Sequence, residues 1–215
     1  MKKRKICIAL GLLAAFALWT IAIQWIDVQP IGPRGSAVGF ATLNGFVHNL
    51  TGTHMTLYVI TDWLGLVPVV FGFGFAALGL AQWIKRKSML KVDGSILILG
   101  GFYVVTLAAY LFFESYVVNY RPVLIEGYLE ASYPSSTTLL VLCVMPTAMM
   151  QLRARIKQPM FRKCVSIVIT AFIAFMVIGR LVSGVHWLTD IIGGILLSAG
   201  LVITYDSLIG GKIHG

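Results

Sequence analysis

The chain has 215 residues, of which 58% are hydrophobic and only 12% are charged, and its mean hydropathy is +0.88. A soluble domain of this size needs more charged residues to cover its surface. The composition therefore excludes a soluble domain and indicates a membrane protein. A formal net charge of +9 would fit a nucleic-acid partner. The basic residues gather outside the predicted spans, however, so the charge is better explained by membrane topology.

Windows of about 19 residues predict six membrane-spanning helices. The chain is therefore expected to be all-α, with one polytopic membrane domain over residues 1–215. The predicted spans are residues 7–26, 55–83, 95–113, 137–152, 165–178 and 187–208. The first span follows MKKRK and continues into AIQWIDVQP without a cleavage site, so we interpret it as a retained helix and not as a secretion signal.

The basic residues test this division into spans. With the N-terminus in the cytoplasm, the inner segments hold all of them except Arg34, Arg121 and Arg180, and the last inner one is Lys212. Because inner loops retain Lys and Arg, this asymmetry predicts that both termini are cytoplasmic. The inner clusters are also expected to attract anionic lipid headgroups, and no nucleic-acid partner is expected.

The outer segment after the first span, residues 27–54, is the longest piece outside the spans and is expected to fold partly onto the membrane surface. It holds His48 and His54, for which a solvated loop position is the simpler interpretation and a catalytic acid the alternative. Asp62 lies within the second predicted span. A carboxylate at that depth indicates either a functional residue or a hydrogen-bonded contact between helices.

The outer loop between the third and fourth spans has the sequence NYRPVLIEGYLEASYPSSTT. Arg121 is followed by Pro122, which fixes the local backbone, and the next helix is expected to open near Ser135, Ser136 and Thr137. Backbone N–H groups and hydroxyls at a helix start bind anions, and an arginine fork matches phosphate oxygens. Capping of the helix by a serine is the plainer interpretation and is compatible with phosphate binding.

The stretch GRLVSGVHWLTD places three ionisable residues at the outer ends of the last two spans. Arg180 is expected to end the fifth helix and His186 to start the sixth. Asp190 follows four residues later, on the same helical face, where its carboxylate can hold one ring nitrogen of the histidine and leave the other free. That arrangement prepares a histidine for nucleophilic or base chemistry. A solvated histidine and a capping aspartate are the alternative, which the second polar cluster on this face disfavours.

These residues resemble the motifs of the type 2 phosphatidic acid phosphatases, a family of membrane lipid phosphatases. The family pattern has three parts: Lys, six residues, Arg-Pro; then Pro-Ser-Gly-His; then Ser-Arg, five residues, His, three residues, Asp. The matching residues in this chain are Arg121, Pro122, Pro134, Ser135, Arg180, His186 and Asp190. The resemblance covers residues 95–208 and agrees with the six-helix plan.

Four positions depart from the family pattern. Glu114, Ser136, Thr137 and Gly179 stand where the family has Lys, Gly, His and Ser. The exchanges between Gly and Ser add or remove one hydroxyl. Glu114 would repel a phosphate by about 1 to 4 kcal/mol at surface-like dielectric, unless it pairs with Arg121 or faces away from the site.

The resemblance implies a mechanism. His186 would attack phosphorus to give a phosphohistidine, Asp190 would orient it, and Arg121 and Arg180 would hold the phosphate. The family's second histidine protonates the leaving oxygen, and Thr137 in its place cannot act as an acid near neutral pH. A diphosphate releases a phosphate monoester with a second pKa of about 6, which departs without help far more readily than an alkoxide. The missing acid therefore favours an isoprenyl diphosphate over a phosphatidate.

We therefore predict a lipid phosphatase or diphosphatase of a bacterial inner membrane, with its site on the outer face and no metal or other cofactor. No cluster of carboxylates or thiolates in the sequence favours a cation. The alternative is a noncatalytic relative that uses the same arginines to bind or carry a phosphorylated lipid. The presence or absence of a substitute acid on the leaving-group side discriminates between the two.

Overall fold

A computed structural model describes residues 2–210 of the chain, so the predicted inner residue Lys212 lies outside the described residues. Within that range the chain is helical and forms no β-strand. The helices long and apolar enough to span a membrane are α1 (Lys2–Trp25), α3 (Met55–Leu64) continued by α4 (Leu66–Arg86), α5 (Gly94–Ser115), α6 (Ser136–Arg155), α7 (Pro159–Val182) and α8 (Leu188–Ile209). The all-α class and the six spans are confirmed.

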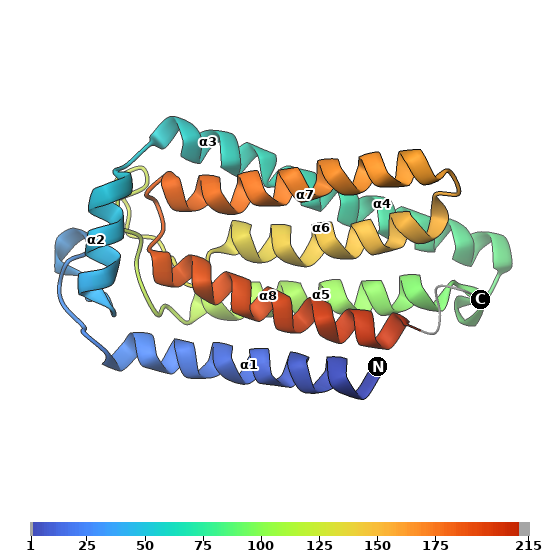
Figure 1. The fold of residues 1–215 in the computed structure, drawn as a ribbon, viewed down its shortest axis with the longest axis horizontal. Coiled ribbons are helices and arrows are strands. Elements are labelled where there is room, and N and C mark those ends of the chain that lie inside the picture. Colours follow the sequence, from blue (N-terminus) through green and yellow to red (C-terminus); the bar gives the residue numbers. More distant parts are fainter. Residues whose placement is uncertain (1, 211–215) are drawn as a thin grey trace.

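Helices α6 and α8 lie side by side at the centre of the bundle. Half of each spanning window is buried, against 17% for α1, which packs along α8 at the edge. Helix α5 packs on both central helices, α4 and α7 pack on α6, and α3 packs on α7. Figure 1 shows that α6 and α8 begin at one end of the bundle, called here the site end, while α1 begins and α8 ends at the opposite end, called the terminal end.

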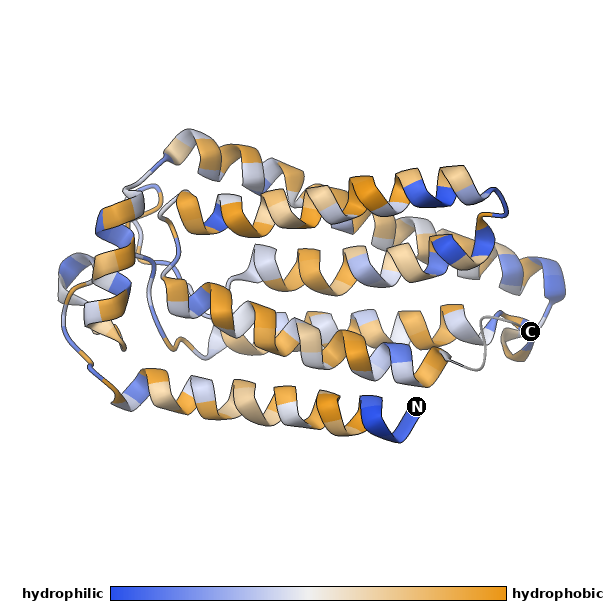
Figure 2. Ribbon diagram, viewed as in Figure 1, coloured by the Kyte–Doolittle hydropathy of each residue, from blue (hydrophilic) through white to orange (hydrophobic). Residues whose placement is uncertain are grey.

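Hydrophilic residues concentrate at the two ends of the bundle (Figure 2). The basic residues of the terminal end lie in residues 2–5, 85–91 and 153–163. Arg34, Arg121 and Arg180 lie at the site end, as the grouping in the sequence predicts. Between the ends the helices are mainly apolar, as the hydrocarbon core of a membrane requires.

The second span consists of two helices and not one. Gly65 separates α3 from α4, and its N–H contacts the carbonyls of Thr61 and Asp62, each at 3.0 Å. Pro68, in the first turn of α4, has no N–H to donate to the carbonyl of Leu64 four residues earlier. The helix is therefore interrupted at Gly65, while Met55–Arg86 as a whole forms the predicted second span. Helices α6 and α7 are longer than predicted, with 20 and 24 residues, because their ends carry polar residues that lower the hydropathy.

Residues 27–54 fold over the site end. After the short 3-10 helix η1 (Pro33–Gly35), α2 (Ala41–Thr51) lies across that end of the bundle (Figure 1). Asn44 ties it to the start of α8, because its side-chain amide donates to the Thr189 hydroxyl at 3.0 Å and its carbonyl accepts from the Thr189 N–H at 3.2 Å. Residues 27–54 thus cover the site end of the bundle.

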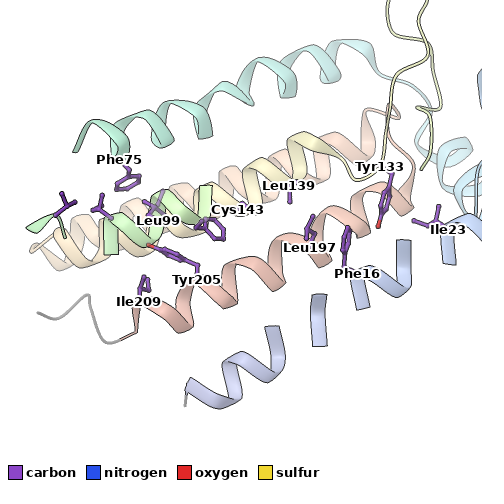
Figure 3. Close-up of a cluster of buried hydrophobic side chains, with 14 residues drawn as sticks. Phe16, Ile23, Phe75, Leu99, Tyr133, Leu139, Cys143, Leu197, Tyr205 and Ile209 are labelled. Atoms are coloured by element: carbon purple, nitrogen blue, oxygen red, sulfur yellow. The ribbon is translucent and has the colours of Figure 1, made fainter. Parts of the chain in front are cut away.

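The largest buried apolar cluster includes Tyr133, which follows directly after a polar residue of the site (Figure 3). Its ring stacks on Phe16 of α1 with 6.1 Å between centroids, and its hydroxyl hydrogen-bonds to Thr20 Oγ1 at 2.7 Å. Gly193 of α8 makes room for the ring, since a Cβ there would lie 2.4 Å from it. Packing of Tyr133 therefore fixes the position of its neighbour Ser132 at the site end.

Candidate functional site

A β-hairpin-like loop between α5 and α6 brings the first group of polar residues together. Tyr120 and Ala131 form an antiparallel bridge, and the turn Ile125–Tyr128 closes the loop. Its central residues Glu126 and Gly127 both have positive φ, 50° and 83°, as a type I′ hairpin turn requires. This hairpin was not predicted, because Glu is not among the residues that favour the first central position of such a turn and only Gly127 was a signal.

The hairpin sets the register of the residues that face the last two helices. The N–H of Arg121 donates to the carbonyl of Glu130 at 3.1 Å, and the N–H of Ser132 donates to that of Asn119 at 2.9 Å. The Asn119 amide in turn donates to Asp190 Oδ1 at 3.3 Å. Backbone pairing thus carries Arg121 and Ser132 to the start of α8.

The connection from α7 to α8 contributes the second group. His186 was predicted to start the last helix. It lies instead in the connection before that helix, and α8 begins at Leu188, one residue after its N-cap Trp187. The carboxylate of Asp190 accepts from the N–H of that N-cap at 2.9 Å. Gly184, with φ of 68°, approaches so closely that a Cβ would lie 1.9 Å from the Gly52 carbonyl oxygen. The connection is therefore a tight turn held against the segment that follows α2.

Ser132 stands between His186 and Asp190. The distance from His186 Nδ1 to Asp190 Oδ2 is 3.9 Å, so the predicted direct hydrogen bond is wrong. Instead, Ser132 Oγ lies 3.0 Å from His186 Nδ1 and donates to Asp190 Oδ2 at 2.5 Å. All three side chains are buried. They form a chain in which the serine hydroxyl links the imidazole to the carboxylate.

Arg180 defines the protonation state of His186. Its Nη2 lies 3.3 Å from His186 Nε2, and a guanidinium only donates, so Nε2 must accept. The proton of the neutral ring is then on Nδ1, which donates to Ser132 Oγ. Burial lowers the pKa of His186 well below its usual value, and the positive charges of Arg121 and Arg180 lower it further. At neutral pH the ring is neutral and presents a lone pair on Nε2 to the arginines.

Tyr58 of α3 joins the two arginines. Arg180 lies over its ring at 5.0 Å and Arg121 at 5.7 Å, both within cation–π range. Each arginine also has an acidic neighbour: Asp62 Oδ1 lies 3.5 Å from Arg180 Nη1, and Glu130 Oε2 lies 3.1 Å from Arg121 Nε. Tyr58 was not predicted, although polar residues four apart on an apolar helix were a signal for a shared face.

Several buried arginine donors at this site lack a hydrogen-bond partner. They are Nε and Nη1 of Arg121 and Nε of Arg180. Glu130 and Arg121 form an ion pair by distance, but the N–H of Arg121 Nε does not point at the carboxylate oxygen well enough to form a hydrogen bond. Buried donors without a partner cost free energy, and an anion with several acceptor oxygens satisfies them.

The remaining predicted residues have separate positions. Ser135 caps α6, where its Oγ accepts from the Thr138 N–H at 3.5 Å. The methyl group of Thr137 faces the break at Gly65, where a Cβ would lie 3.6 Å from it. Ser136 lines a small pocket between α5 and the start of α6.

Glu114, His48 and His54 do not contact the arginines, and His48 lies half-buried in α2 and not in the solvated loop that was expected. Glu114 is exposed at the end of α5 and also borders that small pocket, so the acid that pairs with Arg121 is Glu130. The ring of His48 packs against Trp187, and burial lowers its pKa. His54 Nε2 lies 2.9 Å from the Thr51 carbonyl oxygen.

Gly179, where the family pattern has serine, lies at a close contact between helices. A Cβ at this position would lie 2.9 Å from Cγ2 of Thr61 on α3. The hydroxyl of Thr61 is 3.5 Å from Arg180 Nη1. The glycine thus lets α3 approach α7 and bring a hydroxyl to the arginine. Within residues 2–210, no three His, Cys, Asp or Glu side chains lie together as a metal site requires.

Comparison with known proteins agrees with this geometry. The family model described as the PAP2 superfamily matches residues 96–209, more than half of the chain. The chain belongs to the PAP2 superfamily. The PAP2 fold extends over the whole bundle: the crystal structure of the first transmembrane PAP2 type phosphatidylglycerolphosphate phosphatase from Bacillus subtilis matches with a TM-score of 0.59, 18% sequence identity, and coverage of 94% of this chain and 96% of that one. No curated protein sequence gives a significant match.

Membership of the PAP2 superfamily and the six spans identify an integral membrane protein and support a lipid phosphatase at the level of the family. The motif residues singled out in the sequence include Arg121, Arg180, His186 and Asp190, and the fold brings these four together. It adds Ser132, Tyr58 and Asn119, which come from a loop and from a helix outside the motifs.

Proposed function

We propose that this PAP2 protein hydrolyses a phosphorylated membrane lipid through a phosphohistidine on Nε2 of His186. The observation that carries the proposal is the lone pair of this buried nitrogen, 3.3 Å from Arg180 Nη2 and beside arginine donors without partners. A phosphate held by those donors would place its phosphorus next to the nucleophile. Positioning and charge stabilisation of this kind supply most of the catalysis in phosphoryl transfer.

In the first step, Nε2 of His186 forms a bond to phosphorus and the bond to the leaving oxygen breaks. The ring becomes an imidazolium, whose Nδ1–H donates to Ser132 Oγ, and the Ser132 hydroxyl donates to Asp190. The carboxylate stabilises the positive ring through the serine without taking its proton. Water then attacks phosphorus and the bond between phosphorus and Nε2 breaks, so that the ring becomes neutral again and phosphate leaves with the protons of the water. Arg121 and Arg180 stabilise the charge on the phosphoryl oxygens in both steps.

The residues near the arginines favour a diphosphate substrate. Thr137 supplies no proton near neutral pH, and the nearby carboxylates of Asp62 and Glu130 each pair with an arginine. A phosphate monoester leaves a diphosphate without a proton donor, whereas a lipid alkoxide needs one. We therefore propose an isoprenyl diphosphate as the preferred substrate. The same absence of an acid favours a second candidate, a noncatalytic relative that binds or carries such lipids.

Phosphate release by the purified protein tests the proposal. The panel contains isoprenyl diphosphate, isoprenyl monophosphate, phosphatidate and phosphatidylglycerophosphate. We expect release from the diphosphate to be fastest, and faster than from the monophosphate of the same chain. Binding of all four lipids without turnover of any would replace the enzyme by the noncatalytic candidate.

Removal of the Ser132 hydroxyl should slow turnover without weakening substrate binding. In Ser132→Ala we expect kcat to fall by about 10- to 100-fold, because a hydrogen bond to a charged group contributes about 1.5 to 3 kcal/mol, and KM to stay within about twofold. Ser132→Thr keeps the hydroxyl and should restore part of the rate. Ser115→Ala, at an exposed serine of α5, is the control. An unchanged kcat in Ser132→Ala would remove the serine from the mechanism.

We also propose that the site end faces the outside of a bacterial inner membrane, with both termini in the cytoplasm. The distribution of basic residues supports this orientation. In a background with Cys7 and Cys164 changed to Ser, Tyr128→Cys should react with an impermeant thiol reagent in intact cells, because Tyr128 is 72% exposed at the hairpin tip. Lys157→Cys should react only after permeabilisation. The opposite labelling pattern would reverse the orientation.

A further inference from the structure

A groove with a volume of about 640 Å³ runs along the surface of the bundle, from the terminal end toward the middle of α7. One wall at its mouth is Arg153, in the last turn of α6. The remaining lining comes from α7, from Pro159 in the first turn to Ala174. These residues recur every three or four positions, so the groove follows one face of the helix.

The mouth of the groove is positively charged. Arg153, Arg162 and Lys163 line it, no acidic residue does, and none of the three forms an ion pair within the described part of the chain. Two other arginines of this end, Arg86 and Arg155, instead share the carboxylate of Asp93. The mouth also lies at the N-terminal turn of α7, where the helix dipole adds positive potential. An anion is therefore the complementary ligand.

Beyond the mouth, the floor of the groove has hydroxyls but no free donors. Ser166 Oγ donates to the Arg162 carbonyl at 2.9 Å, and Thr170 Oγ1 donates to the Ser166 carbonyl at 2.8 Å. Both hydroxyls are satisfied within α7, so the floor presents methyl and methylene groups. From Lys163 to Ala174 the helix rises by about 16 Å, roughly half of a 30 Å hydrocarbon core. That length fits an acyl chain in one leaflet.

We propose that this groove binds one anionic phospholipid of the leaflet at the terminal end. Its phosphate lies between Arg153, Arg162 and Lys163, and one acyl chain lies along α7 as far as Ala174. The second large cavity, about 390 Å³ between α4 and α5, has an almost wholly apolar lining without such charges. The proposal depends on the membrane-spanning bundle and not on the catalytic function, because the basic residues that hold the phosphate lie at the end of the bundle opposite the catalytic arginines.

Lipid retention by the intact purified protein tests this site. The delipidated protein is incubated with long-chain phosphatidylglycerol or phosphatidylcholine, with vanadate present to occupy the arginines at the site end, and bound lipid is counted by native mass spectrometry. We expect one tightly retained phosphatidylglycerol and no comparable phosphatidylcholine. The variant R153Q/R162Q/K163Q should lower the affinity on the order of 100-fold, since each basic residue contributes about fivefold. The matched control is K85Q/K87Q/K91Q, which removes three exposed charges from the same end.

A second variant tests the acyl chain. Ala174→Trp fills the far end of the groove without changing its charge, and should weaken retention of long-chain phosphatidylglycerol while leaving that of a short-chain form unchanged. Three results would overturn the proposal: equal retention of both headgroups, equal loss in the control triple variant, or an Ala174→Trp protein that holds long-chain lipid as well as the wild type. None of these readouts depends on turnover, so the catalytic proposal can fail independently.

Discussion

His186→Ala should abolish phosphate release, with a fall in kcat on the order of 10⁴-fold or more, because it removes the nucleophile to which phosphorus bonds. Substrate labelled at the terminal phosphate should leave acid-labile, histidine-linked label on the wild type and none on the variant. Turnover that survives in His186→Ala would exclude the phosphohistidine mechanism.

The leaving group is tested at Thr137 in the same series. Thr137→His places an imidazole in the first turn of α6, on the side that faces Gly65, and should raise activity on a monophosphate more than on a diphosphate. The added histidine donates a proton only when charged, so the gain is present below a pKa of about 6.5 and is lost as the pH rises above it. Equal gains on both substrates would contradict the leaving-group argument and leave the enzyme class intact.

Loss of either buried arginine should weaken anion binding strongly. Arg121→Ala or Arg180→Ala should reduce vanadate affinity by about 1.5 to 3 kcal/mol, measured by titration calorimetry, because charge-assisted hydrogen bonds are lost. Lysine at either position should restore only part of the lost vanadate affinity, since it lacks the bidentate fork of arginine. Arg34→Ala is the control, because this arginine lies at the same end and its guanidinium contacts only the Gly127 carbonyl among the described residues. Unchanged affinity in both alanine variants would exclude the phosphate site.

The sequence predicted the site residues that belong to short motifs. Arg121, Arg180, His186 and Asp190 were identified by type and spacing, and the fold brings them together. The link between His186 and Asp190 was predicted from helical spacing, which failed because the helix begins at Leu188, after the histidine. A four-residue spacing describes a shared face only where both residues are helical.

The rest of the site depends on contacts that are distant in the sequence. Ser132 reaches His186 across 54 positions, and only the hairpin register and the packing of Tyr133 against α1 place it there. Tyr58 and Thr61 approach Arg180 because α3 packs on α7. Hydropathy windows register such a helix as one apolar span and give no information on its partners or its break at Gly65.

The close contact between Gly179 and Thr61 makes these two positions interdependent. Serine at position 179, as in the family pattern, would place a Cβ 2.9 Å from the threonine methyl group, so α3 would have to shift away from α7. The hydroxyl that contacts Arg180 comes from α3 in this chain, whereas the family pattern places a hydroxyl on α7 itself. Relatives with serine at the equivalent of position 179 should therefore carry a smaller residue opposite it, and the two positions should vary as a pair. A change toward the family consensus at one of them alone is a packing defect.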